Sequence, residues 1–304
     1  MQTKDYFVHM TAADAQIRAF AVTGREMVET ARKAHHTSPL ATAALGRLLC
    51  GTVMMGADML KEADDLITVQ IDGDGPLRGL LATADCRGHV KGYVKNPWVI
   101  LPNNEQGHLN VGGGVGNGIL SVIRDMGRAD PYSGQVAIQT GEIAEDLTYY
   151  FAASEQIPSS VGLGVLVDRA GQVMEAGGYI IQLMPAATEE TIDRLEQNLL
   201  SLPSVTELLH SGRTPETILE EALEGLTPVS LERQEVSFYC NCDRDRVARA
   251  LKLLGRKELD DILRDGEDVE LRCHFCGKRY QFPIAEIEQL RREIDTELSP
   301  EQHT

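Results

Sequence analysis

Apolar residues in the first 184 positions follow two spacings, which predict both helices and strands. A helical spacing begins after Ser38-Pro39, because serine suits an N-cap and proline suits the first helical position. It continues through Leu45, Leu48, Leu49 and Val53. Apolar runs bounded by turns predict strands at 66–71, 77–83, 90–94, 161–167 and 172–183, with a helix at 144–154. We therefore expect an α+β domain over residues 1–184, with an antiparallel-rich sheet.

Residues 185–234 have a different composition and pattern. No aromatic residue occurs from 185 to 237, and nine acidic residues stand against two basic ones from 185 to 228. Ser204 with Glu207 forms a capping box, Thr214-Pro215 marks a helix start, and apolar stripes recur at helical spacing. Such short amphipathic helices are stable only when docked on another surface. An ordinary helical connector, which the sequence alone favours, and a metastable linker that can undock both remain open.

Residues 235–304 predict a small separate module. A short strand at 236–239 leads into one cysteine pair, and a strand at 269–272 leads into a second pair. Two helices between the pairs end at Gly255 and Gly266, and a last helix carries Ile284, Ile287, Leu290 and Ile294. A module of this size buries a thin core and commonly needs a metal or disulfide staple.

The two pairs are Cys240-Asn241-Cys242 and Cys273-His274-Phe275-Cys276, thirty residues apart. Four thiolates can close a tetrahedral shell around one Zn²⁺, and a closed shell is typical of structural rather than catalytic zinc. Binding of structural zinc contributes about 10–16 kcal/mol of folding free energy. The same sulfurs can instead be oxidised to disulfides, which would expel the metal. A permanent zinc site and a redox switch therefore both remain open.

Basic residues near the cysteines affect the choice between a permanent zinc site and a redox switch. Positive charge favours thiolate over thiol, and five basic residues lie close in sequence to the cysteines: Arg244, Arg246, Arg272, Lys278 and Arg279. His274 lies between two ligands, and we expect it outside the sulfur shell or at the surface. Cys50 falls in the apolar helix and is expected to be a buried small hydrophobe, whereas Cys86 lies at a turn, where a side chain can be exposed. Neither is assigned to the switch.

The bulk composition excludes some functional classes. The 304-residue chain has a formal net charge of −17 and 42% hydrophobic residues. This charge disfavours general binding to nucleic acid or to anionic membranes. The N-terminus has no basic head followed by an apolar run, and Arg47 and Asp58 interrupt the apolar segment at 41–60. We therefore expect a cytoplasmic protein without a membrane span.

No catalytic constellation is apparent, so we do not expect an enzyme. The glycine-rich segment at 112–118 lacks the Gly-Lys-Ser/Thr ending of a phosphate loop and does not fit Gly-x-Gly-x-x-Gly. A flexible turn before a strand at 119–123 is the expected structure.

The cysteine pattern and its surroundings resemble the 33-kDa redox-regulated heat-shock chaperone family of bacteria. The resemblance rests on Cys240-x-Cys242-x-Arg244-x-Arg246, Cys273-x-Phe275-Cys276, Tyr280-x-Phe282, and two upstream segments, 154–159 and 177–185. It spans nearly the whole chain, and all four ligand positions match. The last dozen residues carry no family signal.

The resemblance implies an ATP-independent holdase that is inactive while the four reduced cysteines bind zinc. Oxidants pair Cys240 with Cys242 and Cys273 with Cys276, zinc is released, and the linker undocks. Oxidised members dimerise, hold unfolding client proteins, and pass them to ATP-driven refolding chaperones. The resemblance thus implies an N-terminal chaperone domain at 1–184, a helical metastable linker at 185–234 and a redox-switch module at 235–304.

Two other functions remain as alternatives. A zinc ribbon that binds RNA or a translation factor is kept open by the local arginines, although the net charge opposes it. A thiol oxidoreductase would need an exposed Cys-x-x-Cys at a helix N-terminus, whereas Cys276 is followed by Gly277 and a strand.

Overall fold

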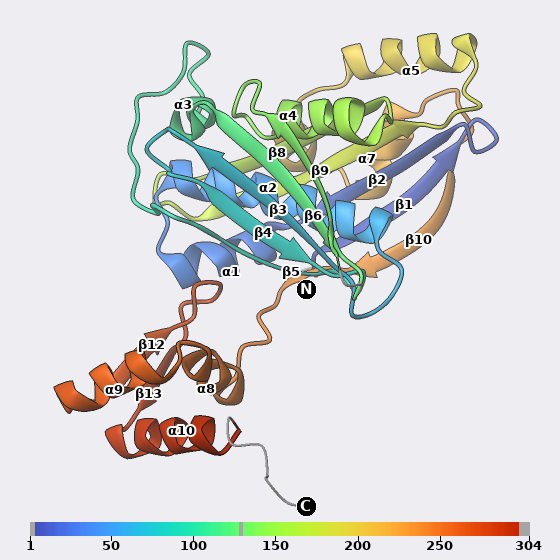
Figure 1. The fold of residues 1–304 in the computed structure, drawn as a ribbon. Coiled ribbons are helices and arrows are strands. Elements are labelled where there is room, and N and C mark those ends of the chain that lie inside the picture. Colours follow the sequence, from blue (N-terminus) through green and yellow to red (C-terminus); the bar gives the residue numbers. More distant parts are fainter. Residues whose placement is uncertain (1–3, 128–129, 298–304) are drawn as a thin grey trace, which may run out of the picture. The chain divides into compact units, whose positions relative to one another are not determined.

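Two sheets form the framework of the first part of the chain. The computed structural model describes residues 4–127 and 130–297, and the chain divides into two compact units with the boundary between Tyr239 and Cys240. In the first unit one sheet has the strand order β10-β1-β2-β9-β8 and the other β11-β5-β4-β3-β6-β7 (Figure 1). Every pairing is antiparallel except that of β11 with β5. The expected α+β class with antiparallel-rich sheets is confirmed.

The predicted strands of this unit are present with small shifts of their ends, whereas β1, β2, β7 and β10 were not predicted. The first sheet contains β1 Tyr6–Ala12, β2 Ile17–Thr23, β8 Ser159–Val167, β9 Val173–Leu183 and β10 Val229–Glu235. The second contains β3 Leu66–Gly73, β4 Leu80–Ala84, β5 His89–Val94, β6 Gly118–Asp125, β7 Tyr132–Ala137 and β11 Ser237–Phe238.

Helix α2, Pro39–Met59, lies between the two sheets and is the centre of the core. It packs on β3, β4 and β5 of one sheet and on β2, β8 and β9 of the other. The predicted cap is present, since the Ser38 hydroxyl accepts a hydrogen bond from the Ala41 N–H at 3.4 Å. By length and composition α2 is apolar enough to cross a membrane, contrary to the expectation from Arg47 and Asp58. Its most apolar stretch is 89% buried, which is typical of a core helix.

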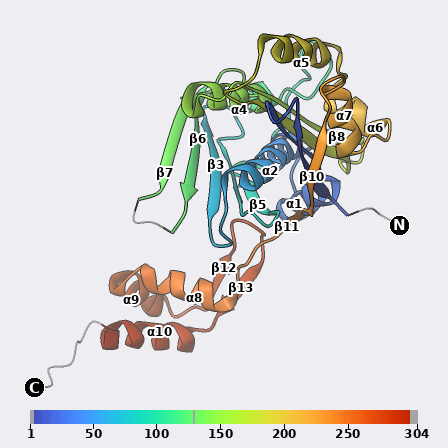
Figure 2. The ribbon, with the colours of Figure 1, turned by 90° about the vertical axis from the view of Figure 1, so that its right-hand side faces the viewer.

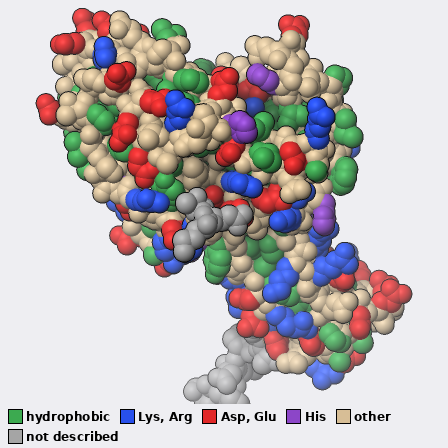
Figure 3. All heavy atoms as spheres, turned by 180° about the vertical axis from the view of Figure 1, so that it is seen from behind, with side chains coloured by type: hydrophobic (Ala, Val, Ile, Leu, Met, Phe, Trp, Pro, Cys, Tyr) green, Lys and Arg blue, Asp and Glu red, His purple; other side chains and the backbone are tan. Residues whose placement is uncertain are grey.

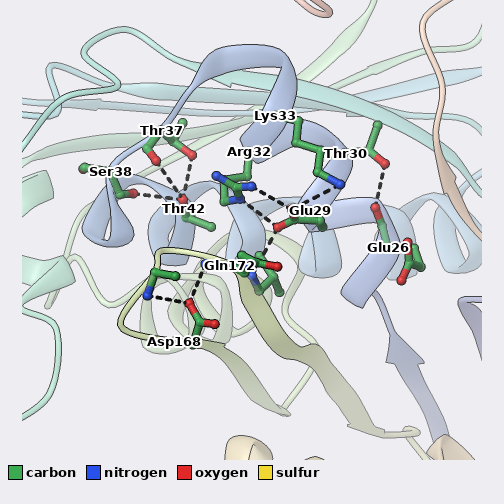
Figure 4. A network of polar contacts seen from close by, with 12 residues as sticks. Glu26, Glu29, Thr30, Arg32, Lys33, Thr37, Ser38, Thr42, Asp168 and Gln172 are labelled. Atoms are coloured by element: carbon green, nitrogen blue, oxygen red, sulfur yellow. Dashed lines mark hydrogen bonds and ion pairs between the residues drawn. The ribbon is translucent and has the colours of Figure 1, made fainter.

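Helix α1, Arg25–His35, is tied to β9 by a polar network. Arg32 donates two hydrogen bonds of 2.7 Å to the Glu29 carboxylate, and Lys33 lies 3.4 Å from it (Figure 4). The Val173 N–H donates to the same carboxylate at 3.1 Å. The hydrogen bonds from Arg32 lower the pKa of Glu29 to about 2, so the carboxylate stays charged and fixes the start of β9.

Two smaller elements differ from the expected pattern. The glycine-rich segment contains a short helix, α3 Val111–Val115, rather than only a flexible turn. Asn110 caps it by accepting a hydrogen bond from the Gly113 N–H at 2.8 Å, which stabilises one helical turn. The predicted helix at 144–154 is α4, Ala144–Tyr150, and it continues as a π-helical turn over Phe151–Glu155.

The segment rich in acidic residues folds onto the outer face of the five-stranded sheet. It contains α5 Glu189–Ser201, α6 Val205–His210 and α7 Pro215–Ala222, followed by the strand β10 in place of further helix (Figure 2). The predicted capping box of Ser204 with Glu207 and the helix start at Thr214 are present. Leucines of α5 and α7 pack with one face of β1 and β2, while the alternate residues of those strands face α2. The sheet is therefore apolar on both faces.

The second unit combines a hairpin with three helices. Strand β12, Val269–Arg272, pairs antiparallel with β13, Arg279–Phe282. The helices are α8 Arg244–Leu253, α9 Arg256–Asp265 and α10 Ile284–Glu297. Among the residues whose side chains are described, the core holds six buried apolar residues: Leu251, Leu259, Tyr280, Phe282, Ile287 and Ile294. This thin core agrees with the expectation that the module needs a staple.

Candidate metal centre

Two turns bring the four cysteines of the second unit together. Cys240 and Cys242 lie just before α8, and Cys273 and Cys276 lie in the turn between β12 and β13. Their Sγ atoms all lie within 4.8 Å of one another. Two sulfur–sulfur contacts join the two pairs, at 3.8 Å from Cys240 to Cys273 and at 3.3 Å from Cys242 to Cys276. All four are free thiols in this structure.

These distances match a single tetrahedral metal site. Four sulfurs at the usual Zn–S distance of about 2.3 Å lie about 3.8 Å from one another, whereas a disulfide needs about 2.05 Å. Soft thiolate ligands in a tetrahedral arrangement select zinc or iron–sulfur chemistry over hard cations such as Mg²⁺. The geometry therefore fits one metal ion held by Cys240, Cys242, Cys273 and Cys276, with no protein ligand left to add.

Local backbone structure holds both pairs in place. The Asp243 carboxylate accepts a hydrogen bond from the Arg246 N–H at 2.7 Å and so caps α8 directly after the first pair. In the second pair the Cys273 N–H donates to the Lys278 carbonyl, and the Gly277 N–H donates to the Cys273 carbonyl, both at 2.9 Å. Gly277 has a φ of +70°, a conformation that side chains other than glycine rarely adopt. This closed turn places two sulfurs on the same side of the hairpin.

Tyr280 on β13 contacts the first cysteine pair. Its hydroxyl donates to the Cys242 carbonyl at 3.0 Å and lies 3.2 Å from the Cys242 Sγ. Burial pushes the pKa of the Cys242 thiol upward, but hydrogen bonds from Tyr280 and the neighbouring cysteines outweigh it and lower that pKa to about 7. Burial raises the pKa of Cys240 and raises that of Cys276 to about 11. One thiolate of the four is thus favoured even without a metal.

Hydrogen bonds, rather than the positive charges expected from the sequence, lower the pKa of the Cys242 thiol. Arg244 forms an ion pair with Glu286 at 2.6 Å and lies over the Phe282 ring. Arg279 pairs with Glu270 at 3.4 Å, and the Lys278 ammonium lies 5.2 Å from the centre of the Tyr280 ring. The contact of Tyr280 with Cys242 is not among the interactions expected from the sequence. The sequence feature that could have indicated this contact is the spacing of two residues between Tyr280 and Phe282, shortly after the second cysteine pair. This spacing places both rings on the same, buried face of β13.

The other predicted positions are not members of the four-sulfur cluster. Cys50 is fully buried in α2, as expected, and burial raises its thiol pKa. Cys86 is half-buried beside β5, and its Sγ lies 3.3 Å from the Glu62 carbonyl. His274 is exposed, in agreement with a position outside the sulfur shell.

The two upstream segments that carried the sequence resemblance lie side by side in the first unit. The Leu183 N–H donates to the Pro158 carbonyl at 2.9 Å, and Ser159 pairs with Gln182 in the ladder of β8 and β9. Gln182 is fully buried and accepts hydrogen bonds from Arg18, the shorter at 2.8 Å. These residues build the sheet on which the helices α5–α7 dock, and they contain no catalytic arrangement among the described residues.

Comparison with known proteins gives one consistent result. A family model described as Hsp33 protein matches residues 5–283. The chain is 55% identical to a 33 kDa chaperonin of Agathobacter rectalis over 287 residues, which cover 94% of this chain and 99% of that protein. It is 46% identical to a 33 kDa chaperonin of Clostridioides difficile, with 96% and 100% covered. The crystal structure of a 33 kDa chaperonin from Thermotoga maritima superposes with a TM-score of 0.89 at 39% identity, covering 96% of this chain and 99% of that one.

Proposed function

The chain belongs to the Hsp33 family, whose members are chaperones and not enzymes, and we propose that it is an ATP-independent holdase activated by oxidation. The clustering of the four cysteine sulfurs within 4.8 Å is the single observation that carries this proposal. Cys240, Cys242, Cys273 and Cys276 bind one Zn²⁺ in the reduced protein and serve as the redox switch.

The thin core of the second unit supports the role of the metal in folding. Six buried apolar residues cannot by themselves stabilise a module of this size, whereas structural zinc contributes about 10–16 kcal/mol. Loss of the metal therefore unfolds the module. The Tyr280 hydroxyl, which contacts both the backbone and the sulfur of Cys242, orients one ligand of the site.

Oxidation removes the ligands two at a time. Each peroxide molecule oxidises one thiolate to a sulfenic acid, and the neighbouring thiol then displaces water to form a disulfide. Two peroxides consume four thiols and give the disulfides Cys240–Cys242 and Cys273–Cys276. Disulfide sulfurs are no longer thiolates, so the four cysteines cease to hold the metal and the module loses its staple.

Residues 185–234 are the element that responds. Helices α5, α6 and α7 have 13, 6 and 8 residues, and helices this short are unstable alone in water. They are held by apolar contacts with the sheet, without one aromatic side chain of their own. Undocking exposes the outer face of β1, β2 and β9, and this apolar face holds unfolded clients.

The remaining partners follow from the family. We propose that the oxidised protein forms a homodimer in the cytoplasm and passes its clients to ATP-dependent refolding chaperones after reduction. Acidic and basic side chains lie interspersed on the face drawn in Figure 3, and the net charge of −17 opposes nucleic-acid binding.

An aggregation assay tests this function. The zinc-bound reduced protein and the protein treated with peroxide at heat-shock temperature are each mixed with a thermally unfolding client, and light scattering is followed. Suppression by the oxidised form alone supports the proposal, and equal suppression by both forms contradicts it. Salt-dependent nanomolar binding of RNA by the reduced form would instead favour a zinc-ribbon module.

A further inference from the structure

The edge strand β10 is joined to β1 mainly through its backbone. Three of its side chains add polar contacts: Arg233 with Tyr6 and Glu216, Gln234 with the Cys86 carbonyl, and Glu235 with Lys4. The strand pairs antiparallel with β1, from Tyr6 opposite Glu235 to Thr11 opposite Val229. Six of its seven residues are exposed, and only Gln234 is half-buried. Its side chains therefore contribute little burial, and the stability of the pairing comes from the ladder of main-chain hydrogen bonds.

A bulge interrupts this ladder near its middle. His9 is opposite Glu232 and Met10 is opposite Ser230, so Leu231 has no partner on β1. The Leu231 side chain is 57% exposed, although leucine in a sheet normally packs against neighbours. The pairing of β10 with β1 is therefore less regular than that of β2, which matches β1 from Phe7 to Ala12 without a shift.

Strand β1 would be a very different edge from β10. Its seven residues contain no Asp, Glu, Lys or Arg, and five of them are buried. By contrast β10 carries Glu232, Arg233 and Glu235, the kind of charged residues that protect a sheet edge from pairing with other chains. Release of β10 converts a protected edge into an apolar, uncharged one.

The backbone groups that would become free can be identified. The Val236 N–H donates to the Asp5 carbonyl at 3.0 Å, whereas the Tyr6 N–H points toward β2 and donates to the Thr23 hydroxyl at 3.4 Å. Backbone groups in an antiparallel strand alternate between its two sides. The N–H groups of Phe7, His9 and Thr11 therefore face β10, and those of Tyr6, Val8 and Met10 face β2.

We propose that the β1 edge is a client site: an extended segment of an unfolded protein replaces β10 and pairs antiparallel with β1. This inference rests on the proposed function, because it needs the segment 185–235 to undock. The structure of β10 shows what the edge accepts, namely a strand bound through its main chain with little demand on its side chains. Main-chain pairing suits clients of unrelated sequence, which an apolar pocket of fixed shape would not.

The position of β10 connects this edge to the switch. β10 ends five residues before Cys240 in the sequence, and Arg233 of β10 lies 3.6 Å from Glu216 of α7. The strand is therefore linked covalently to the cysteine module and by an ion pair to the docked helices. Loss of both supports leaves β10 with its interrupted ladder and the exposed contacts of Arg233 with the Tyr6 ring, Gln234 with the Cys86 carbonyl and Glu235 with Lys4.

Residue-resolved hydrogen exchange tests the proposal with an internal control. The oxidised protein is examined with and without reduced, carboxymethylated α-lactalbumin, which stays unfolded. The amides of Phe7, His9 and Thr11 should exchange freely without this client and at least about tenfold more slowly with it. The amides of Tyr6, Val8 and Met10 face β2 and should stay protected in both samples.

Two exchange results would overturn the client site. One is protection of the Phe7, His9 and Thr11 amides without client, which would mean that β10 or the strand of a second copy already pairs with β1. Pairing with a second copy would be recognised by protection that rises with protein concentration. The other is free exchange at these three amides while the client is bound. Failure of the protein to bind this client at all would instead contradict the proposed function.

A peptide with the sequence of residues 229–235 supplies an independent test on the same oxidised protein. N-methylation at Glu232 and Gln234 removes the N–H groups that face β1, and N-methylation at Arg233 and Glu235 removes those that face away. The second peptide should displace the client, and the first should not. Pairing at this edge is contradicted if both peptides displace the client equally. It is also contradicted if the protein holds the client and neither peptide displaces it.

Discussion

The Tyr6 hydroxyl donates a 2.8 Å hydrogen bond to the Glu216 carboxylate and so joins β1 to α7. Arg233 of β10 lies 3.8 Å above the Tyr6 ring and 3.6 Å from the same carboxylate. Burial and the contact with Glu216 raise the pKa of Tyr6 to about 12, so its hydroxyl stays a donor at physiological pH. One buried residue of the sheet thus contacts both the last helix and the last strand of the segment that we propose to undock.

Tyr6→Phe should loosen this segment without disturbing the core. The change removes one hydrogen bond to a charged group, worth about 1.5–3 kcal/mol, and keeps the ring that Arg233 covers. We expect faster trypsin cleavage at Arg213 in the reduced protein and a lower oxidant dose for activation. Tyr149→Phe, at a tyrosine that is 42% exposed on α4, is the matched control. Equal cleavage rates in the two variants would show that the contact does not hold the segment.

Leu223→Asp should activate the protein without oxidant. Leu223 is fully buried against the outer face of β1 and β2, and a buried unpaired carboxylate costs several kcal/mol. We expect proteolytic sensitivity within 185–235 and partial suppression of client aggregation while all four thiols stay reduced. Leu200→Asp is the control, because Leu200 is 88% exposed on α5. If the variant is as resistant to proteolysis and as inactive in holding clients as the reduced parent, the hypothesis of a metastable linker is wrong.

Asp5→Asn should remove a pH-dependent part of the stability of the first unit. Burial raises the pKa of Asp5 from 3.8 to about 6, so the folded state binds a proton that the unfolded state has already lost. The stability from this group is therefore complete below about pH 4 and is lost as the pH rises through 6, a change of about 3 kcal/mol. Asparagine does not titrate but can still accept from the Met27 N–H, which lies 2.7 Å from the carboxylate.

The measurement compares urea unfolding of the two proteins at pH 4 and pH 7. Relative to the parent, Asp5→Asn should gain stability between pH 4 and pH 7, since the parent loses the contribution of the protonated acid. A difference in unfolding free energy that does not change with pH would contradict the pKa assigned to Asp5.

Tyr280→Phe should weaken metal binding by about tenfold. The Tyr280 hydroxyl is the donor that contacts Cys242, and its loss leaves a thiolate ligand without this hydrogen bond. Competition with a chromophoric zinc chelator gives the affinity. Tyr132→Phe, at a tyrosine that is 43% exposed on β7, controls for a general effect of removing a phenol. Unchanged affinity in Tyr280→Phe would exclude a role of this hydroxyl at the centre.

Local sequence signals predicted the elements that are fixed by local chemistry. Ser38 before Pro39, Ser204 with Glu207, and Gly266 at the end of α9 each mark a helix boundary, because a cap is a contact within a few residues. The four cysteines could be grouped for the same reason, since metal ligands come in close pairs. These predictions needed no knowledge of distant contacts.

Features that depend on distant contacts were not predictable in this way. Strand β10 is polar and exposed, and it is a strand only because β1 offers an edge 218 or more residues earlier in the chain. The pairing of Tyr6 with Glu216 and of Tyr280 with Cys242 likewise joins residues 210 and 38 positions apart. The sequence could not show whether the strands form one sheet or two sheets around α2. The alternation of apolar and polar residues along a strand does not identify the strands with which it pairs.

The most direct test of the redox switch is to follow zinc release and client holding in the same sample after addition of peroxide at heat-shock temperature. A zinc-sensitive dye reports the metal, and aliquots are assayed by light scattering with an unfolding client. We expect one zinc released and four thiols consumed per chain, with holding activity appearing at the same rate. Full holding activity while zinc remains bound to four reduced cysteines would contradict the redox switch.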